Sequence, residues 1–186
     1  MPYPSKINKE TIVQAARELI EAEGVDGVWV NPLAERLEVK PPSLYRYVKN
    51  KNDLLRAVNE ETVKGLFVAL APALASSGAV EARLMTAAHA YRAYAHANPV
   101  TYGLNFTNTL PEIQPENNVG MVLPYQALMA QISGEAESLS ALRGFLALMH
   151  GFVMLELSHQ YQRGGDLNVA FEKSVRAYLA GWQLKE

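Results

Sequence analysis

Residues 33–55, LAERLEVKPPSLYRYVKNKNDLL, hold the pattern that decides the fold. The stretch opens with apolar residues at helical spacing, Leu33, Ala34 and Leu37, which predict a short amphipathic helix. A break follows, and the next run opens with two prolines, which suit the first turn of a helix because its N–H groups have no intrahelical partner. That run keeps only Leu44 and Val48 apolar. Two short helices joined by a tight turn, the second with a polar, aromatic and basic outer face, predict a helix-turn-helix.

Positive charge gathers on the same stretch. Between residues 36 and 56 the sequence has six basic residues, Arg36, Lys40, Arg46, Lys49, Lys51 and Arg56, against two acidic ones, Glu38 and Asp53. This local excess of four positive charges stands in a chain whose formal net charge is -2. A phosphate-binding surface requires such a patch. The plainer alternative is a helical hairpin whose basic face is only solvated.

The motif L-A-x-x-L-x-V-x-P-x-x-L-Y-x-Y-x-x-x-K-x-x-L-L resembles the DNA-binding segment of TetR-family transcriptional regulators. With the preceding helix, the resemblance covers about the first quarter to third of the chain. It implies that Tyr45, Tyr47 and Lys51 contact phosphates, while Lys40, Pro42, Ser43 and Arg46 flank or face the bases. With Asn31, these are the eight candidate DNA-binding residues: Asn31, Lys40, Pro42, Ser43, Tyr45, Arg46, Tyr47 and Lys51.

Several positions depart from the family pattern. Glu38 stands where glycine is usual, and a positive φ there costs about 1 kcal/mol. Lys40 replaces a common Ser or Thr cap, and Pro42 removes a backbone N–H that could bind a phosphate. Trp29 replaces a small hydroxyl residue, which leaves Asn31 as the expected cap of the second helix. These changes leave the base preference unpredicted.

Composition narrows the class of protein. The 186 residues are 49% hydrophobic and include no cysteine, which excludes disulfides, thiolate metal sites and cysteine nucleophiles. The N-terminal residues have no apolar signal-peptide core, and no run of about 18 apolar residues occurs. We expect a cytoplasmic protein that does not enter a membrane. Residues 1–56 have a net charge of +1 and residues 57–186 one of -3, so DNA contact should be local to the patch.

The helical periodicity predicts an all-α fold of about nine helices, as the TetR resemblance also implies. We expect a helix-turn-helix domain over residues 1–52 and a helical ligand-binding and dimerisation domain over residues 53–186. The first helix should start after Asn8 and end at Gly24, and the fourth should be capped by Asn50. The later helices are predicted at 80–97, 100–107, 118–133, 135–163 and 167–184, with a loop at 108–117. Pro124 either kinks the seventh helix or marks its start.

The second domain is rich in methionine and aromatic residues, which more often form a core than a pocket. The resemblance implies a cavity for a small, mostly apolar effector, with His89, Tyr94 and Tyr125 as polar handles. The candidate ligand-binding residues are His89, Tyr94, Phe106, Met121, Tyr125, Met129, Met149 and Phe152.

Residues 148–156, LMHGFVMLE, resemble the His-Gly subgroup of the same family, with Gly151 expected to serve close helix packing. We expect His150 to be a buried histidine, with a ligand contact as the alternative. We expect a homodimer in which the last two helices of each chain form a four-helix bundle. The candidate interface residues are Phe145, Phe152, Phe171, Val175, Tyr178 and Trp182.

The sequence argues against an enzyme. Glu156 and His159 match one Glu-x-x-His motif of di-iron bundles, but that chemistry needs two such motifs and two further glutamates. We expect no metal and no cofactor. The predicted function is a repressor that leaves a palindromic double-stranded DNA operator when the effector binds. The alternatives are an architectural DNA-binding protein without an effector and a helical-bundle metalloenzyme, which the sequence favours least.

Overall fold

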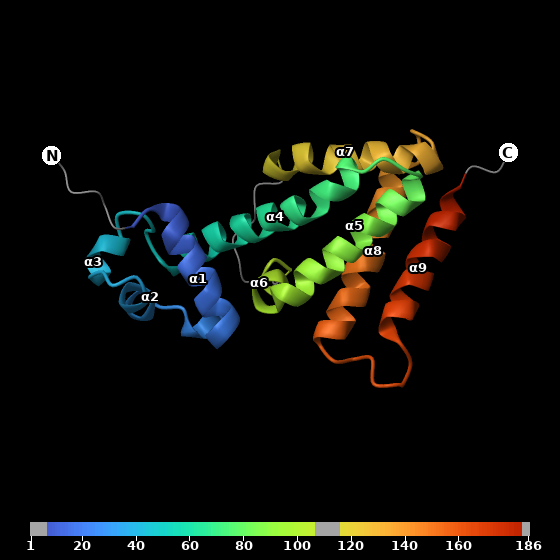
Figure 1. The fold of residues 1–186 in the computed structure, drawn as a ribbon. Coiled ribbons are helices and arrows are strands. Elements are labelled where there is room, and N and C mark those ends of the chain that lie inside the picture. Colours follow the sequence, from blue (N-terminus) through green and yellow to red (C-terminus); the bar gives the residue numbers. More distant parts are fainter. Residues whose placement is uncertain (1–6, 107–115, 184–186) are drawn as a thin grey trace. The chain divides into compact units, whose positions relative to one another are not determined.

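The computed structural model describes residues 7–106 and 116–183, and these residues form helices and no strands (Figure 1). This confirms the all-α prediction. The elements are α1 (Lys9–Glu23), a 3₁₀ turn (Val25–Gly27), α2 (Val30–Arg36), α3 (Pro41–Leu44), α4 (Lys51–Ala75), α5 (Val80–Ala97), α6 (Pro99–Leu104), α7 (Glu116–Ser133), α8 (Ser138–Leu157) and α9 (Leu167–Trp182).

The helices form two compact units. The first comprises residues 1–65 and 98–113, and the second residues 66–97 and 114–186. In the first unit α1 packs against α2 and α6, and in the second α8 packs against α5, α7 and α9. Helix α4 supplies residues to both units.

The predicted caps of α1 and α4 are present. The Asn8 side chain accepts the Thr11 N–H at 2.8 Å, and the Asn8 N–H donates to the Thr11 hydroxyl at 3.0 Å. Gly24 ends α1 with a φ of 79°, which glycine adopts without strain. At α4, Asn50 accepts the N–H of Asp53 at 2.9 Å. Side-chain oxygens thus satisfy N–H groups that the helix leaves unpaired.

One predicted helix start is wrong, and one of the two alternatives for another is excluded. A cap at Asn31 predicts that α2 starts at Pro32, but α2 begins two residues earlier, at Val30, because the extended Trp29 already accepts the N–H of Leu33 at 3.2 Å. Trp29 is therefore the N-cap residue, without a capping side chain. Helix α7 begins at Glu116, so Pro124 lies inside the helix and does not start it. The predicted loop at 108–117 falls mostly outside the described residues.

Three predicted helix ends are too late. Helix α8 ends at Leu157, not at residue 163, because His159 takes a φ of 55°, which a right-handed helix cannot continue. Helix α6 spans Pro99–Leu104, and α9 ends at Trp182. Between α8 and α9 the chain turns near Gly165 (φ 135°), and Asp166 caps α9 by accepting the N–H of Asn168 at 2.8 Å.

By length and composition α8 could cross a membrane, with a mean hydropathy of 1.4 over its most apolar window. In this fold it packs between neighbouring helices and carries the buried, ion-paired Glu156. That is the arrangement of a core helix in a helical bundle.

Close packing in α8 occurs at Gly144 and not at Gly151. A Cβ added at Gly144 would collide with the hydroxyl oxygen of Tyr178 and lie 3.0 Å from its Cζ atom. The Tyr178 ring cannot easily move, because its hydroxyl donates to the carbonyl oxygen of Ala141 at 2.7 Å. A Cβ at Gly151 meets no atom of the chain within 4 Å. The prediction that Gly151 packs closely is thus wrong within a single chain.

We therefore predict opposite effects for two alanine substitutions in one helix. Gly144→Ala should lower the free energy of unfolding by about 1–3 kcal/mol, because α8 and α9 must separate. Gly151→Ala should raise it by about 0.5–1 kcal/mol, because alanine favours the helix where space is free. Urea denaturation followed by circular dichroism measures both. Equal effects of the two substitutions would contradict this account of α8.

Candidate DNA-binding surface and ligand cavity

The helix-turn-helix is held by buried apolar side chains on its inner face. Leu33, Ala34, Leu44 and Val48 are all at most 4% exposed and belong to the core of the first unit. Because Leu44 and Val48 point inward, Tyr45 and Arg46 between them are exposed. The outer face of α3 and the turn after it therefore carries the side chains available to DNA.

Glu38 occupies the turn between α2 and α3 with a φ of 53°. Its N–H donates to the carbonyl oxygen of Glu35 at 3.0 Å, and the N–H of Val39 donates to that of Ala34 at 2.9 Å. These bonds fix the turn in the left-handed region that glycine would enter without strain. Glu38 thus keeps the positive φ of the usual glycine position, a question that the sequence left open.

The basic patch divides into paired and unpaired cations. Arg36 donates to Glu18 at 2.6 Å and Arg56 donates to Asp53 at 2.8 Å. Across residues 7–106 and 116–183, four patch cations form no ion pair: Lys40, Arg46, Lys49 and Lys51. These four are the cations whose charge is available to phosphates.

The structure separates the remaining DNA-binding candidates by their surroundings. Pro42 and Asn31 are exposed, Ser43 is half-buried, and Tyr45 is 54% exposed. Tyr47 is half-buried, and its hydroxyl donates to the carbonyl oxygen of Ile7 at 3.0 Å. This hydrogen bond ties Tyr47 to Ile7, which lies just before the N-cap of α1.

A surface hollow of about 420 Å³ lies in the first unit. Its rim includes Asn31, Tyr45, Lys49 and Lys51, four polar residues from α2, the segment after α3 and the start of α4. The rim also includes Trp29, which is 60% exposed and was not among the predicted DNA-binding residues. The ammonium Nζ of Lys51 lies 4.8 Å from the centre of the Trp29 ring. Nothing in the sequence indicated this contact, because Lys51 lies 22 residues from Trp29 and no basic residue stands beside Trp29 in the chain.

The second unit contains an apolar cavity of about 260 Å³. Residues of α4, α5, α7 and α8 line it, including Phe67, Ala87, Tyr125, Arg143 and Met149. Tyr125 and Met149 are two of the predicted ligand-binding residues. Burial raises the pKa of the Tyr125 hydroxyl, so this group stays protonated and can donate a hydrogen bond.

Six predicted pocket residues do not line this cavity: His89, Tyr94, Phe106, Met121, Met129 and Phe152. His89 is exposed with its ring 5.9 Å from that of Phe171, and Met129 is fully buried. Phe106 belongs to the first unit, where its ring lies 5.2 Å from that of Tyr102. Most of the lining is leucine and other apolar residues at helical spacing, whose direction the sequence does not reveal.

The predicted dimer residues lie mainly inside the chain. Phe145, Phe171 and Val175 are at most 2% exposed, and Phe145 also lines the cavity. Phe152, Tyr178 and Trp182 are half-buried, with the Tyr178 ring 6.3 Å from that of Trp182. The exposed large apolar side chains of α8 and α9 are others: Leu139, Leu146, Leu155 and Val169. His150 is half-buried, and burial lowers its pKa.

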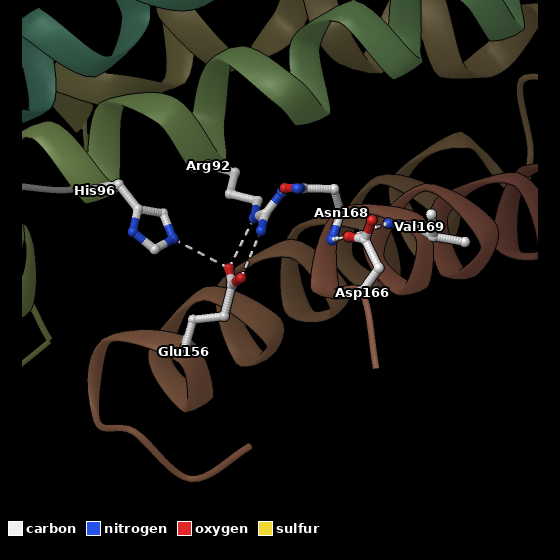
Figure 2. Close-up of polar contacts among 6 residues, drawn as sticks. All are labelled: Arg92, His96, Glu156, Asp166, Asn168 and Val169. Carbon is white, nitrogen blue, oxygen red and sulfur yellow. Dashed lines mark hydrogen bonds and ion pairs between the residues drawn. The ribbon is translucent and has the colours of Figure 1, made fainter. Parts of the chain in front are cut away.

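A buried ion pair joins α5, α8 and α9 in the second unit (Figure 2). Arg92 donates to both oxygens of Glu156, through Nε at 2.8 Å and Nη2 at 2.6 Å. It also donates to the Asn168 side chain at 2.8 Å, and the Nε2 atom of His96 lies 3.1 Å from Glu156. The Glu156 side chain is only 4% exposed. Burial alone would raise its pKa, but the hydrogen bonds from Arg92 and His96 outweigh burial and lower it.

This cluster has no arrangement for a metal. Glu156 is already occupied by Arg92 and His96, and His159 lies beyond the end of α8. Within the part of the chain that the structure describes, no three His, Cys, Asp or Glu side chains are grouped to hold a metal ion.

A helix-turn-helix with four cations outside the ion pairs of the described residues, followed by a helical unit with an apolar cavity that opens to the surface, defines a DNA-binding transcriptional regulator. The chain belongs to the TetR family. Residues 12–58 match the family "Bacterial regulatory proteins, tetR family", and residues 84–178 match "Tetracyclin repressor-like, C-terminal domain".

Relatives support this membership over most of the chain. An uncharacterised helix-turn-helix transcriptional regulator of Mycobacterium tuberculosis is 34% identical over 160 residues, which are 83% of this chain and 72% of the relative. A second such regulator, of Bacillus subtilis, is 29% identical over 182 residues, or 94% and 92% of the two chains. A solved structure of a protein with unknown function from Rhodococcus sp. RHA1 shares the fold, with a TM-score of 0.79, 20% identity and coverage of 99% and 100%.

Proposed function

We propose that this regulator is a homodimeric, cytoplasmic repressor that leaves its DNA operator when a small apolar molecule fills the cavity of the second unit. Residues 1–52 bind DNA in this proposal, and residues 53–186 bind the effector and the second copy. The observation that carries it is the combination of four unpaired cations on the helix-turn-helix with an apolar cavity elsewhere in the same chain.

The cavity limits the effector's size and chemistry. An apolar cavity of about 150 Å³ holds benzene, a ring of six carbon atoms. A cavity of about 260 Å³ therefore has room for about ten non-hydrogen atoms. Its walls are mostly apolar side chains, so we propose a largely apolar effector with at most one hydrogen-bonding group facing Tyr125.

Two helices provide a route from the cavity to the DNA-binding unit. Leu66, Phe67 and Leu70 of α4 line the cavity, and Lys51 begins the same helix. Helix α5 also lines the cavity, and α6 follows it after one residue. Glu21 of α1 accepts the N–H groups of Val100 and Thr101, at 3.0 and 2.8 Å, so α6 is bonded to α1. A change at α4 or α5 thus reaches elements that position the recognition helix.

A dimer is required because one recognition helix reads too few bases to specify a site. We propose that the exposed faces of α8 and α9, including Leu155 and Val169, pair with a second copy. Two half-sites are then expected about 34–36 Å apart along the DNA.

Footprinting on the DNA beside the protein's own gene tests the proposal. A palindromic protected site that disappears with a bound effector is the expected result. Uniform protection without sequence preference, together with a steep salt dependence, would indicate an architectural DNA-binding protein instead.

Ala87 offers a test of the cavity that needs no knowledge of the effector. Ala87 is 3% exposed and lines the cavity, so Ala87→Phe should fill it. We expect this variant to lose at least about tenfold in affinity for 1-aminonaphthalene, a polarity-sensitive fluorophore of about the cavity's size. Ala93→Phe, at an exposed position of the same helix, is the matched control and should bind the fluorophore as the wild type does. Unchanged fluorophore binding by Ala87→Phe would exclude this cavity as the site.

A further inference from the structure

The Trp29 side chain has no evident structural role. It is the N-cap residue of α2 but forms no side-chain capping bond, and at 60% exposure it contributes little to the core. Tryptophan carries a large apolar surface with one N–H donor, a combination that is enriched at interfaces, and the exposed Tyr45 lines the same hollow.

Its ring instead supports a cation. The Lys51 ammonium lies 4.8 Å from the ring centre, within the range at which an indole face attracts a positive charge. Lys51 forms no ion pair with a carboxylate among the described residues, and its ammonium lies against the Trp29 ring. The residues described around the hollow include Lys49 and Lys51 and no carboxylate.

We infer that Trp29, Lys51 and the hollow beside them form a seat for one phosphate and its adjoining deoxyribose on the DNA backbone. In this seat the indole face holds the Lys51 ammonium toward the phosphate. The indole N–H, a donor without an acceptor function, is available to a phosphate oxygen, and the ring edge packs on the sugar. Trp29 is thus a positioning residue for Lys51 and a backbone contact itself.

The backbone suits this hollow better than a base does. A base reaches such a surface only after unstacking from the duplex, which costs a few kcal/mol. The sugar and phosphate already lie on the outside of the duplex. Positive charge on Lys49 and Lys51 complements the phosphate, and the aromatic surfaces of Trp29 and Tyr45 complement the sugar.

The inference rests on DNA binding by the first unit, and fluorescence can test it directly. The chain has two tryptophans, Trp29 and Trp182, and Trp182 lies in the second unit. Trp182→Phe leaves Trp29 as the reporter, and Trp29→Phe leaves Trp182. Titration with a random duplex of about 30 base pairs at low salt should change the emission of Trp29 and leave that of Trp182 nearly constant, because backbone contacts form on any sequence.

Affinity measurements on the same duplex separate the two roles of Trp29. Trp29→Ala should weaken binding about five- to tenfold, from the lost cation–π contact and the lost hydrogen bond to a charged group. Lys51→Gln should lower the slope of log affinity against log salt by about 1. Because Trp29 positions Lys51, the double variant should lose less than the sum of the two single losses. Thermal unfolding of all variants should stay near the wild type, since both side chains are at least partly exposed.

The outcomes distinguish two failures. If the wild-type protein binds no DNA at low salt, the proposed function itself fails. If it binds, but Trp29→Ala binds equally well and Trp29 emission does not change, the seat is wrong and DNA binding by the helix-turn-helix remains. Strictly additive losses in the double variant would overturn the positioning role of Trp29.

Discussion

Glu156→Ala should lower the free energy of unfolding by about 3–5 kcal/mol, the cost of breaking a buried ion pair from one side. The substitution leaves the Arg92 guanidinium, whose side chain is only 15% exposed, without its carboxylate. Arg92 cannot turn to water easily, because its guanidinium carbon lies 5.1 Å from the Phe171 ring centre and 5.9 Å from that of Phe152. Urea denaturation measures the loss, and the melting temperature should fall by about 10 °C.

A second ion pair of the same length provides the control. Arg176 donates to Glu172 at 2.6 Å, but both side chains are exposed, by 67% and 42%. Water and salt screen such a pair, so Arg176→Ala should leave stability unchanged within measurement error. A loss for Arg176→Ala as large as that for Glu156→Ala would show that burial does not govern the difference.

The same pair gives stability a defined pH dependence. Because the pKa of Glu156 is lower in the folded state than its ordinary value of 4.5, its stabilisation is fully present above about pH 4.5. It is lost as the pH falls through the folded-state pKa, where the carboxylate is protonated. Glu156→Gln should therefore show a weaker decline of stability in acid than the wild type.

Replacing the four unpaired cations of the helix-turn-helix with glutamine should lower affinity for a random duplex at least about a hundredfold at low salt. Each of Lys40, Arg46, Lys49 and Lys51 that contacts a phosphate releases a counterion, so each single replacement should reduce the salt slope by about 0.9. Fluorescence anisotropy over a series of salt concentrations measures both quantities.

The paired cations of the same patch are the matched controls. Arg36 and Arg56 are bonded to Glu18 and Asp53, and each side chain is about half exposed. Removing either also frees a carboxylate, yet we expect only a small change in the salt slope. If Arg36→Gln reduced the slope as much as Arg46→Gln, proximity to DNA and not ion pairing would decide which cations bind phosphate.

The helix-turn-helix was predictable because its determinants are local. The prolines, the cap at Asn50 and the spacing of Leu33, Leu44 and Val48 act within a few residues of one another. The prediction that Asn31 caps α2 was wrong, because the backbone hydrogen bond accepted by Trp29 outweighed the preference of asparagine for the cap position.

The cavity and the proposed dimer face were harder to predict, because both depend on which way long apolar helices turn. Helix α8 is apolar on nearly all sides, so periodicity does not show that Phe145 faces inward and Leu155 outward. The ion pair between Arg92 and Glu156 could not be predicted from local spacing, because the two residues are 64 positions apart in the sequence.

Glu38 finally bears on how such a regulator responds in the cell. Its negative charge lies in the turn of the DNA-binding motif, where it repels phosphates, and Glu38 is not among the residues that line the cavity. In the proposed mechanism, a repressor that binds DNA less tightly needs a smaller energetic contribution from its effector to leave the operator. If the proposal holds, substitutions at this one turn residue should change the effector concentration that releases the DNA while the chemical identity of the effector stays the same.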